Sequence, residues 1–319
     1  MNILYCIDDA YLAQAAVSLS SVLKSNPVAH INVTIAGLGL EKGRAAGLFT
    51  PLLKRHPRCR IAIHDLNTEM FAGLPVTPRF SKSVYTRILL DRFMGPEVER
   101  VLYLDADTIV QADLLLLWEM DLKGKTIGAA PDHFRLENEV IGSADDEPYF
   151  NSGVIFFDMT AWRAKGYEQK VLNYLAREGH KLPWMDQDAL NVILRGDVLF
   201  IDIGWNFQPR CADVPAVFLG LSKRQYDSLR SKPYIVHYTT SVKPWNLGYQ
   251  VHYSDRFFHA VQQAGLGELF PKPRPADTRQ RWDSLKTKLR WRFPRLFRIA
   301  RTVLRPKSAA LMYRAGAEG

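Results

Sequence analysis

The sequence predicts an α/β fold in which helices flank both faces of one mostly parallel sheet. Short apolar strand patterns alternate with helix patterns through the first hundred residues, and acidic residues follow the first and the fourth of these strands. In open sheets of this kind, ligands bind beyond the carboxyl ends of the strands. The chain has 319 residues, 47% of them hydrophobic, which is enough for one large domain or two smaller ones.

The first hundred residues supply most of the predicted sheet. Asn26-Pro27 is a stop signal after the first helix, and no Gly-x-Gly-x-x-Gly or Walker A motif follows a strand. The predicted strands are residues 2–7, 31–36, 60–64 and 100–104, and the predicted helices are residues 10–25, 41–55 and 83–93.

The middle of the chain is less regular. Residues 127–130, 151–157 and 234–238 have strand patterns, and residues 160–178 and 186–194 have helix patterns. Asp158 or Thr160 is the expected N-cap of the longer helix. A proline-rich joint at residues 270–275 then predicts a domain boundary, with a body at 1–270 and a tail at 271–319.

Charge divides along the same boundary. The whole chain has 42 Lys/Arg and 33 Asp/Glu, and residues 272–319 carry 14 of the Lys/Arg and 3 of the Asp/Glu. The rest of the chain therefore has 28 basic and 30 acidic residues. The body is therefore close to neutral, and we expect no nucleic-acid partner. Apolar and aromatic residues recur at helical spacing in the tail, so residues 279–305 are expected to lie as basic amphipathic helices on an anionic membrane. The alternative is a C-terminal helix packed on the body.

The cysteines and the N-terminus favour a cytoplasmic location. The three cysteines are widely spaced, and no pair has metal-ligand spacing. The first residues form a strand pattern without a basic, cleavable signal, and no apolar run approaches the ~18 residues of a membrane span.

The pair Asp105 and Asp107 ends the buried strand pattern at residues 100–104. Side chains two apart in extended backbone point the same way, so the two carboxylates can converge on one point. They repel each other unless a cation or a proton lies between them, and hard oxygen ligands suit Mg²⁺ or Mn²⁺ holding a phosphate. The alternative is an acidic turn after a strand.

Four further segments carry side chains that suit a phosphate or a sugar, and each has an ordinary structural alternative. Asp8 and Asp9 can instead cap a helix, Arg87 can be a surface residue, Asp186 and Asp188 can stabilise a helix N-terminus, and His237 can be a satisfied polar residue. The full set is Asp8 and Asp9; Arg87; Asn151 and Gly153 with Asp186, Gln187 and Asp188; and His237 with Lys243.

Seven motifs follow one another in an order typical of one family. They are Ile7-Asp8-Asp9-x-Tyr11, Tyr85-Thr86-Arg87, Val101-Leu-Tyr-Leu-Asp105-Ala-Asp107, Gly128-Ala-Ala-Pro-Asp132, Tyr149-Phe-Asn151-Ser-Gly153-Val154, Asp186-Gln187-Asp188-Ala-Leu-Asn191 and His237-Tyr238…Lys243-Pro-Trp245. They cover residues 1 to about 250, and in them the chain resembles glycosyltransferase family 8. It is most similar to the retaining bacterial α-galactosyltransferases and α-glucosyltransferases that extend lipopolysaccharide or lipooligosaccharide.

The resemblance implies a GT-A fold, with a single Rossmann-like mixed sheet flanked by helices and a basic amphipathic C-terminal tail. It implies a UDP-galactose or UDP-glucose donor, a lipid-linked glycan acceptor, and Mn²⁺ as the metal, with Mg²⁺ as the alternative. By position in the motifs, the metal ligands are Asp105, Asp107 and His237; the donor-binding residues are Asp8, Asp9, Arg87, Ala106, Asn151, Gly153, Asp186 and Lys243; Asp132 lies near the acceptor; and Gln187 is on the reactive face of the sugar, with Asp188 as the rival nucleophile.

Resemblance also places the enzyme at the inner face of the bacterial cytoplasmic membrane. Two departures affect donor binding: Ala10 stands where the family often has Asn, and Thr240 where it usually has Gly. Two other functions stay open. A haloacid-dehalogenase-type phosphatase would use Asp105 and Asp107 with Asp197 and Asp202 in a later acidic motif, and a non-catalytic protein would only bind a nucleotide sugar.

Overall fold

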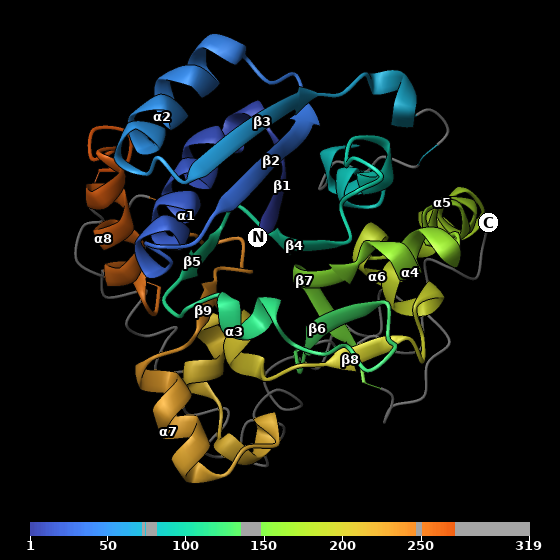
Figure 1. Cartoon of the computed structure of the whole chain (residues 1–319). Helices are drawn as coiled ribbons and strands as arrows, with labels where there is room; N and C mark the ends of the chain where they lie inside the picture. Colours follow the sequence, from blue (N-terminus) through green and yellow to red (C-terminus); the bar gives the residue numbers. More distant parts are fainter. Residues whose placement is uncertain (72–73, 75–81, 135–147, 247–250, 272–319) are drawn as a thin grey trace, which may run out of the picture.

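A computed structural model describes residues 1–71, 74, 82–134, 148–246 and 251–271 (Figure 1). Its main sheet has seven strands in the order β3-β2-β1-β4-β7-β6-β8. The strands are β1 Asn2–Asp8, β2 Ile31–Leu38, β3 Cys59–Asp65, β4 Arg100–Leu104, β6 Ile127–Pro131, β7 Phe150–Asp158 and β8 Val198–Phe200. The predicted strands in the body are therefore confirmed, and β8 was not predicted.

Strand direction makes the sheet mixed. β1 to β4 pair in parallel, β7 runs antiparallel between β4 and β6, and β8 is parallel to β6. The strand pattern at residues 151–157 located β7 but carried no information on its direction. As a result, the start of β7 lies at the same edge as the carboxyl ends of β4 and β6.

Helices cover both faces, as expected for an α/β fold. Figure 1 shows α1, α2 and α8 on one side of the sheet and α4, α5 and α6 on the other. Two separate buried clusters of apolar side chains correspond to these two faces. The helices are α1 Leu12–Ser25, α2 Lys42–Arg55, α3 Leu115–Trp118, α4 Met159–Ala164, α5 Tyr167–Glu178, α6 Met185–Ile193, α7 Lys223–Ser231 and α8 Ser254–Ala264.

Two predicted helices are different in the structure. Residues 83–93 form two short 3₁₀ helices, Lys82–Arg87 and Leu90–Arg92, instead of one α-helix. Residues 85–90 are all buried, so the apolar pattern indicated a buried helix but not its hydrogen-bonding geometry. Residues 160–178 divide into α4 and α5 because Gly166, with φ of 62°, breaks the helix. Asp158 is confirmed as the N-cap of α4, accepting from Ala161 N at 2.8 Å.

A second, two-stranded sheet positions part of the site. β5, Thr108–Val110, pairs antiparallel with β9, Ile235–His237, and Thr108 lies opposite His237. The predicted strand at residues 234–238 is thus confirmed, but outside the main sheet. This pairing brings His237 from late in the chain beside Asp107.

Asp197 lies at the opposite edge of the main sheet from Asp105. It precedes β8, which is parallel to β6 and therefore begins where β4 begins, whereas Asp105 follows the carboxyl end of β4. Its carboxylate accepts hydrogen bonds from Thr126 Oγ1 at 2.6 Å, Tyr167 Oη at 2.6 Å and Lys165 Nζ at 2.8 Å. Asp197 is a structural residue, so it does not complete a phosphatase site with Asp105.

We expect Asp197→Asn to lower stability by about 1–2 kcal/mol at pH 7, after allowance for solvent screening. Burial opposes ionisation, but the bonds from Lys165, Thr126 and Tyr167 lower the pKa of Asp197 to about 2. The folded pKa is below that of the unfolded chain, so the stabilisation is present above pH 4 and is lost as the pH falls towards 2. Urea unfolding of both proteins at decreasing pH checks this, and a stability difference that grows with acid would contradict it.

The predicted tail helices at residues 279–305 lie outside the described residues. Within the described part of the chain, no helix is both long and apolar enough to cross a bilayer.

Candidate active site

The site lies where β4 ends, β7 begins and β9 ends. The backbone of Asp105 donates to Gly153 O at 2.8 Å, which fixes the strand end of β4 against the start of β7. Tyr238 N donates to Asp107 O at 3.0 Å and ties β9 to the same point. Segments from three distant parts of the sequence therefore converge at the carboxyl edge of the sheet.

Asp105, Asp107 and His237 form one cluster, as the sequence predicted. Each offers one ligand atom, and these atoms all lie within 4.8 Å of one another. His237 Nε2 is 3.4 Å from Asp105 Oδ2 and 3.2 Å from Asp107 Oδ1. Two carboxylate oxygens and one imidazole nitrogen are a donor set that suits Mn²⁺.

Asn206 orients the imidazole of His237. Its Oδ1 lies 2.8 Å from His237 Nδ1, which therefore donates, and Nε2 faces the two carboxylates. His237 is only 3% exposed, so its ring has little freedom to turn. The residues thus present a fixed nitrogen to a divalent ion, as a metal site requires.

Electrostatics in the cluster also favour a cation. Burial opposes the charge on Asp107, but Lys243 and His237 outweigh it and hold the pKa of Asp107 well below its usual range. Burial similarly opposes protonation of His237, and Asp107 with Asp105 raises the pKa of His237 to about 9. The pKa of Asp105 is lowered as well, so both carboxylates are ionised at neutral pH, with protonated His237 and Lys243 beside them. A divalent ion bound here would take the place of the proton on His237 Nε2, because a metal-bound imidazole is neutral.

Gly153 is required by this packing. A Cβ atom at this position would lie 2.0 Å from His237 Cε1 and 2.7 Å from Asp105 Oδ2. Real Cβ contacts are essentially never below 3.0 Å. Gly153 therefore lets the start of β7 pass directly beneath the cluster.

Arg87 joins the cluster to the start of α6. Its guanidinium lies 3.2 Å from Asp105 Oδ1 and 3.0 Å from Asp186 Oδ2, and it donates to Ser152 O at 2.8 Å. It also stacks over the ring of Tyr103, 4.6 Å from the centroid, and Tyr103 donates to Asp105. Burial raises the pKa of Asp186 to about 6 although Arg87 lowers it. Arg87 is thus a buried residue of the site.

Lys243 approaches from the segment after β9. Its Nζ lies 2.5 Å from Asp107 Oδ2, and its side chain is 14% exposed. Trp245 holds this segment in place by packing on Phe257 of α8, with the ring centroids 5.0 Å apart. A mostly buried ammonium group beside the metal cluster is suited to an anionic ligand.

Gln187 and Asp188 lie in different surroundings. Gln187 Oε1 accepts from Ser152 N at 2.9 Å, and Arg87 contacts the carbonyl oxygen of the same residue. Asp188 is fully buried and accepts from Tyr149 Oη at 2.7 Å and Trp184 N at 2.9 Å. Gln187 thus faces the start of β7, whereas Asp188 anchors the first turn of α6.

A chain of amides leads from the cluster to Asp132. Asn206 Nδ2 donates to Asn151 Oδ1 at 2.9 Å, and Asn151 Nδ2 donates to Asp132 Oδ2 at 3.2 Å. Asn151 Oδ1 also accepts from Gly153 N at 3.0 Å. Asp132, which follows β6, is therefore in the same network as the cluster of Asp105, Asp107 and His237.

The three remaining donor-binding predictions concern Asp8, Asp9 and Ala106. One carboxylate oxygen of Asp8, at the end of β1, is buried and has no hydrogen-bond partner among the described residues. Asp9 is instead paired with Arg44 and accepts from Glu41 N at 3.0 Å, so it connects β1 to α2. Ala106 is buried between Asp105 and Asp107.

Sequence reasoning missed Asn206, Ser152 and Tyr103. Tyr103 lies two residues before Asp105 on a strand, so the period of two could have indicated it. Asn206 lies in a 3₁₀ helix at Ile203–Asn206, where no pattern distinguishes it.

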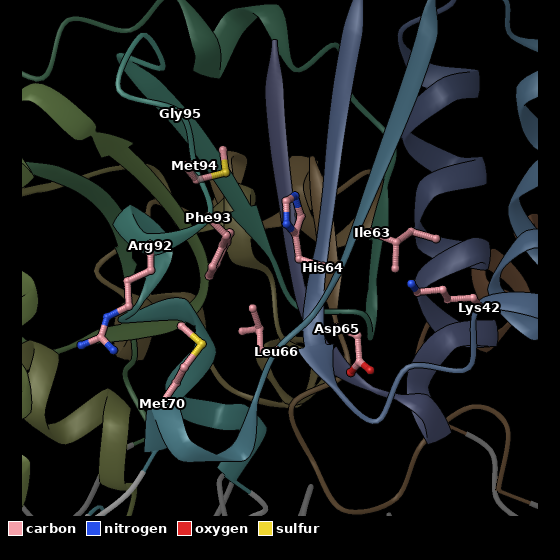
Figure 2. A pocket seen from close by; sticks show the side chains of 10 residues that line it. All are labelled: Lys42, Ile63, His64, Asp65, Leu66, Met70, Arg92, Phe93, Met94 and Gly95. Atoms are coloured by element: carbon pink, nitrogen blue, oxygen red, sulfur yellow. The ribbon is translucent and has the colours of Figure 1, made fainter.

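A cavity of about 620 Å³ lies apart from these residues (Figure 2). It is beside β3, at the edge of the sheet, and is lined by Lys42, Ile63, His64, Asp65, Leu66, Met70, Arg92, Phe93, Met94 and Gly95. None of the predicted site residues lines it. The charged cluster, rather than this open cavity, has the chemistry of an active site.

Comparisons with known proteins agree with this geometry. The model of glycosyl transferase family 8 matches residues 2–247. General stress protein A of Bacillus subtilis is 29% identical over 269 residues, covering 81% of this chain and 92% of that protein. Lipopolysaccharide 1,2-glucosyltransferase of Escherichia coli K12 is 27% identical over 256 residues, covering 77% of this chain and 73% of that protein.

A solved structure has the same fold. Galactosyltransferase LgtC, determined with donor and acceptor sugar analogues, superposes with a TM-score of 0.69 at 28% identity, over 83% of this chain and 95% of LgtC. The mixed sheet with flanking helices is thus the GT-A fold. The family match extends over most of the chain and includes every residue of the cluster, and we conclude that the chain belongs to glycosyltransferase family 8.

Proposed function

We propose that the protein is a retaining hexosyltransferase that moves galactose or glucose from a UDP-sugar to a lipopolysaccharide- or lipooligosaccharide-type glycan with Mn²⁺. The convergence of Asp105, Asp107 and His237 carries this proposal. It is supported by Arg87 and Lys243, which add two cations at the same point, where a diphosphate needs them. The names of the two relatives, a glucosyltransferase and a galactosyltransferase, support the sugar class.

Each group has a defined task in this proposal. Asp105, Asp107 and His237 would hold the divalent ion, which supplies positive charge for the leaving UDP. Lys243 would bind the diphosphate, and Asp8 would accept a hydrogen bond from the base through the oxygen that has no partner among the described residues. Arg87 keeps Asp105 and Asp186 in position.

Gln187, rather than Asp188, is the better candidate for contact with the donor sugar. Both oxygens of Asp188 accept hydrogen bonds inside the protein, and the residue has no exposed surface. Gln187 is less buried and lies next to Ser152 and the cluster. In our proposal Gln187 is therefore at the reactive face, and Asp188 supports it from α6.

The experiment measures UDP release from UDP-galactose and UDP-glucose, with Mn²⁺, with Mg²⁺ and with EDTA. We expect turnover with one of the two donors, enhanced by a glycan acceptor and lost in EDTA. Phosphate release from an aryl phosphate without use of either donor would favour a phosphatase. Tight UDP binding without any turnover would favour a non-catalytic protein.

For localisation, we propose that the protein is cytoplasmic and peripheral on the inner membrane face. Deleting residues 272–319 removes the segment with 14 Lys/Arg and 3 Asp/Glu, and should move the protein from the membrane to the supernatant fraction. Slow donor hydrolysis by the body should remain. Loss of hydrolysis with unchanged fractionation would contradict this role of the tail.

A further inference from the structure

Arg210 lies next to Asp132, and nothing so far has given it a role. It is in the 3₁₀ helix Pro209–Asp213. One face of its guanidinium covers the ring of Phe134, with Cζ 4.0 Å from the centroid. Nε donates to Gln208 Oε1 at 2.7 Å. The side chain is therefore held on one face and one edge.

Gln208 builds this position into the active site. It is 2% exposed, and its Nε2 donates to Asp132 Oδ1 at 3.2 Å. Its Oε1 also accepts from Thr239 Oγ1 at 3.0 Å, two residues after His237. A buried amide thus links Arg210 to both Asp132 and the segment of the metal ligand.

In the described part of the chain, the terminal nitrogens of Arg210 form no hydrogen bond. Among the described residues, their nearest carboxylate contact is Asp132 Oδ1, 3.6 Å from Nη2, and the side chain is 39% exposed. Charge-assisted hydrogen bonds of this type are usually about 2.7–2.9 Å long. Asp132 also accepts from Phe134 N, Gln208 and Asn151, which disperse its charge. Within the described part of the chain, the guanidinium therefore has no charge-assisted hydrogen bond to a carboxylate, and its ion-pair partner is Asp132 at 3.6 Å.

A planar guanidinium with a fixed face and a free edge matches the two oxygens of a carboxylate or a phosphate. We propose that Arg210 binds an anionic group, a phosphate or a carboxylate, on the acceptor glycan, and so selects anionic acceptors. This proposal rests on the transferase function above and names the class of acceptor. It makes Arg210 a specificity residue on the acceptor side of Asp132.

The test compares Arg210→Gln with the wild type on one core oligosaccharide in three forms: native, dephosphorylated and carboxyl-reduced. Loss of a charge-assisted pair should raise the KM for the native acceptor by about 10- to 100-fold. The KM for the form that lacks the recognised anion should change little, and kcat should fall less than KM rises. If the variant and the wild type have similar KM values on the dephosphorylated acceptor, the recognised anion is a phosphate. If their KM values are similar on the carboxyl-reduced acceptor, it is a carboxylate.

Two further variants keep the outcome interpretable. Arg224→Gln removes the same charge from the exposed face of α7 and should leave the KM for the native acceptor unchanged. Arg210→Lys keeps the charge without the fork and should recover part of the affinity. Equal KM changes with all three acceptor forms would overturn the proposal but leave the transferase function intact. Absence of UDP-sugar turnover in the wild type would overturn both.

Discussion

Gly153→Ala is expected to lower the rate of sugar transfer by about 100-fold or more, because displaced catalytic groups cost that much even for shifts near 1 Å. The new Cβ would lie 2.0 Å from His237 Cε1 and 2.7 Å from Asp105 Oδ2. The imidazole cannot turn away, since Asn206 holds Nδ1 and the ring is buried. One methyl group should therefore separate two of the three proposed metal ligands.

The measurement is transfer rate as a function of Mn²⁺ concentration, with stability followed by urea unfolding. Overpacking should also cost about 1–3 kcal/mol of stability. Gly47→Ala in α2 is the matched control, because a Cβ there meets no atom within 4 Å and alanine favours a helix. Full activity of the Gly153→Ala protein would show that the cluster is not the active site.

Asp107→Ala should lower kcat by roughly 10³-fold or more, a loss at the upper end for removal of one electrostatic stabiliser. The change removes a metal ligand and leaves His237 and Lys243 without the carboxylate that lies 3.2 Å and 2.5 Å away. Two buried cations would then share one carboxylate, Asp105, which lies 3.4 Å from His237 Nε2, so excess Mn²⁺ should not restore the rate.

Donor turnover by this variant is compared with that of Asp227→Ala. Asp227 forms an exposed ion pair with Lys223 on α7, and such pairs contribute little, so this control should retain its activity. A decrease in kcat of less than about tenfold for Asp107→Ala would exclude Asp107 as a metal ligand.

The sequence was informative where chemistry depends on local spacing. The sequence correctly predicted that Asp105 and Asp107 converge, and β1, β2, β3 and β4 follow from their apolar patterns. The extended backbone assumed for the pair is wrong, because residues 106–107 form a turn in which Thr108 N donates to Asp105 O at 3.2 Å. Arg87 was also found, although its helix is 3₁₀ rather than α.

Long-range pairing could not be derived in this way. Nothing local states that β7 is antiparallel, or that β9 pairs with β5 and so brings His237 to Asp107. Asn206 and Gln208 act through contacts with residues far away in the sequence, and neither belongs to a segment whose apolar pattern predicts a helix or a strand. Motif order, rather than periodicity, connected His237 with the acidic pair.

Calorimetric titration with UDP, in Mn²⁺ and in EDTA, tests the central claim most directly, because it measures the metal–diphosphate site without requiring the acceptor. The wild type should bind UDP with Mn²⁺ at least about tenfold more tightly than in EDTA. Asp107→Ala should bind UDP weakly and equally in both conditions. Equal UDP affinity of the wild type with and without metal would contradict the assignment of Asp105, Asp107 and His237 as a metal site.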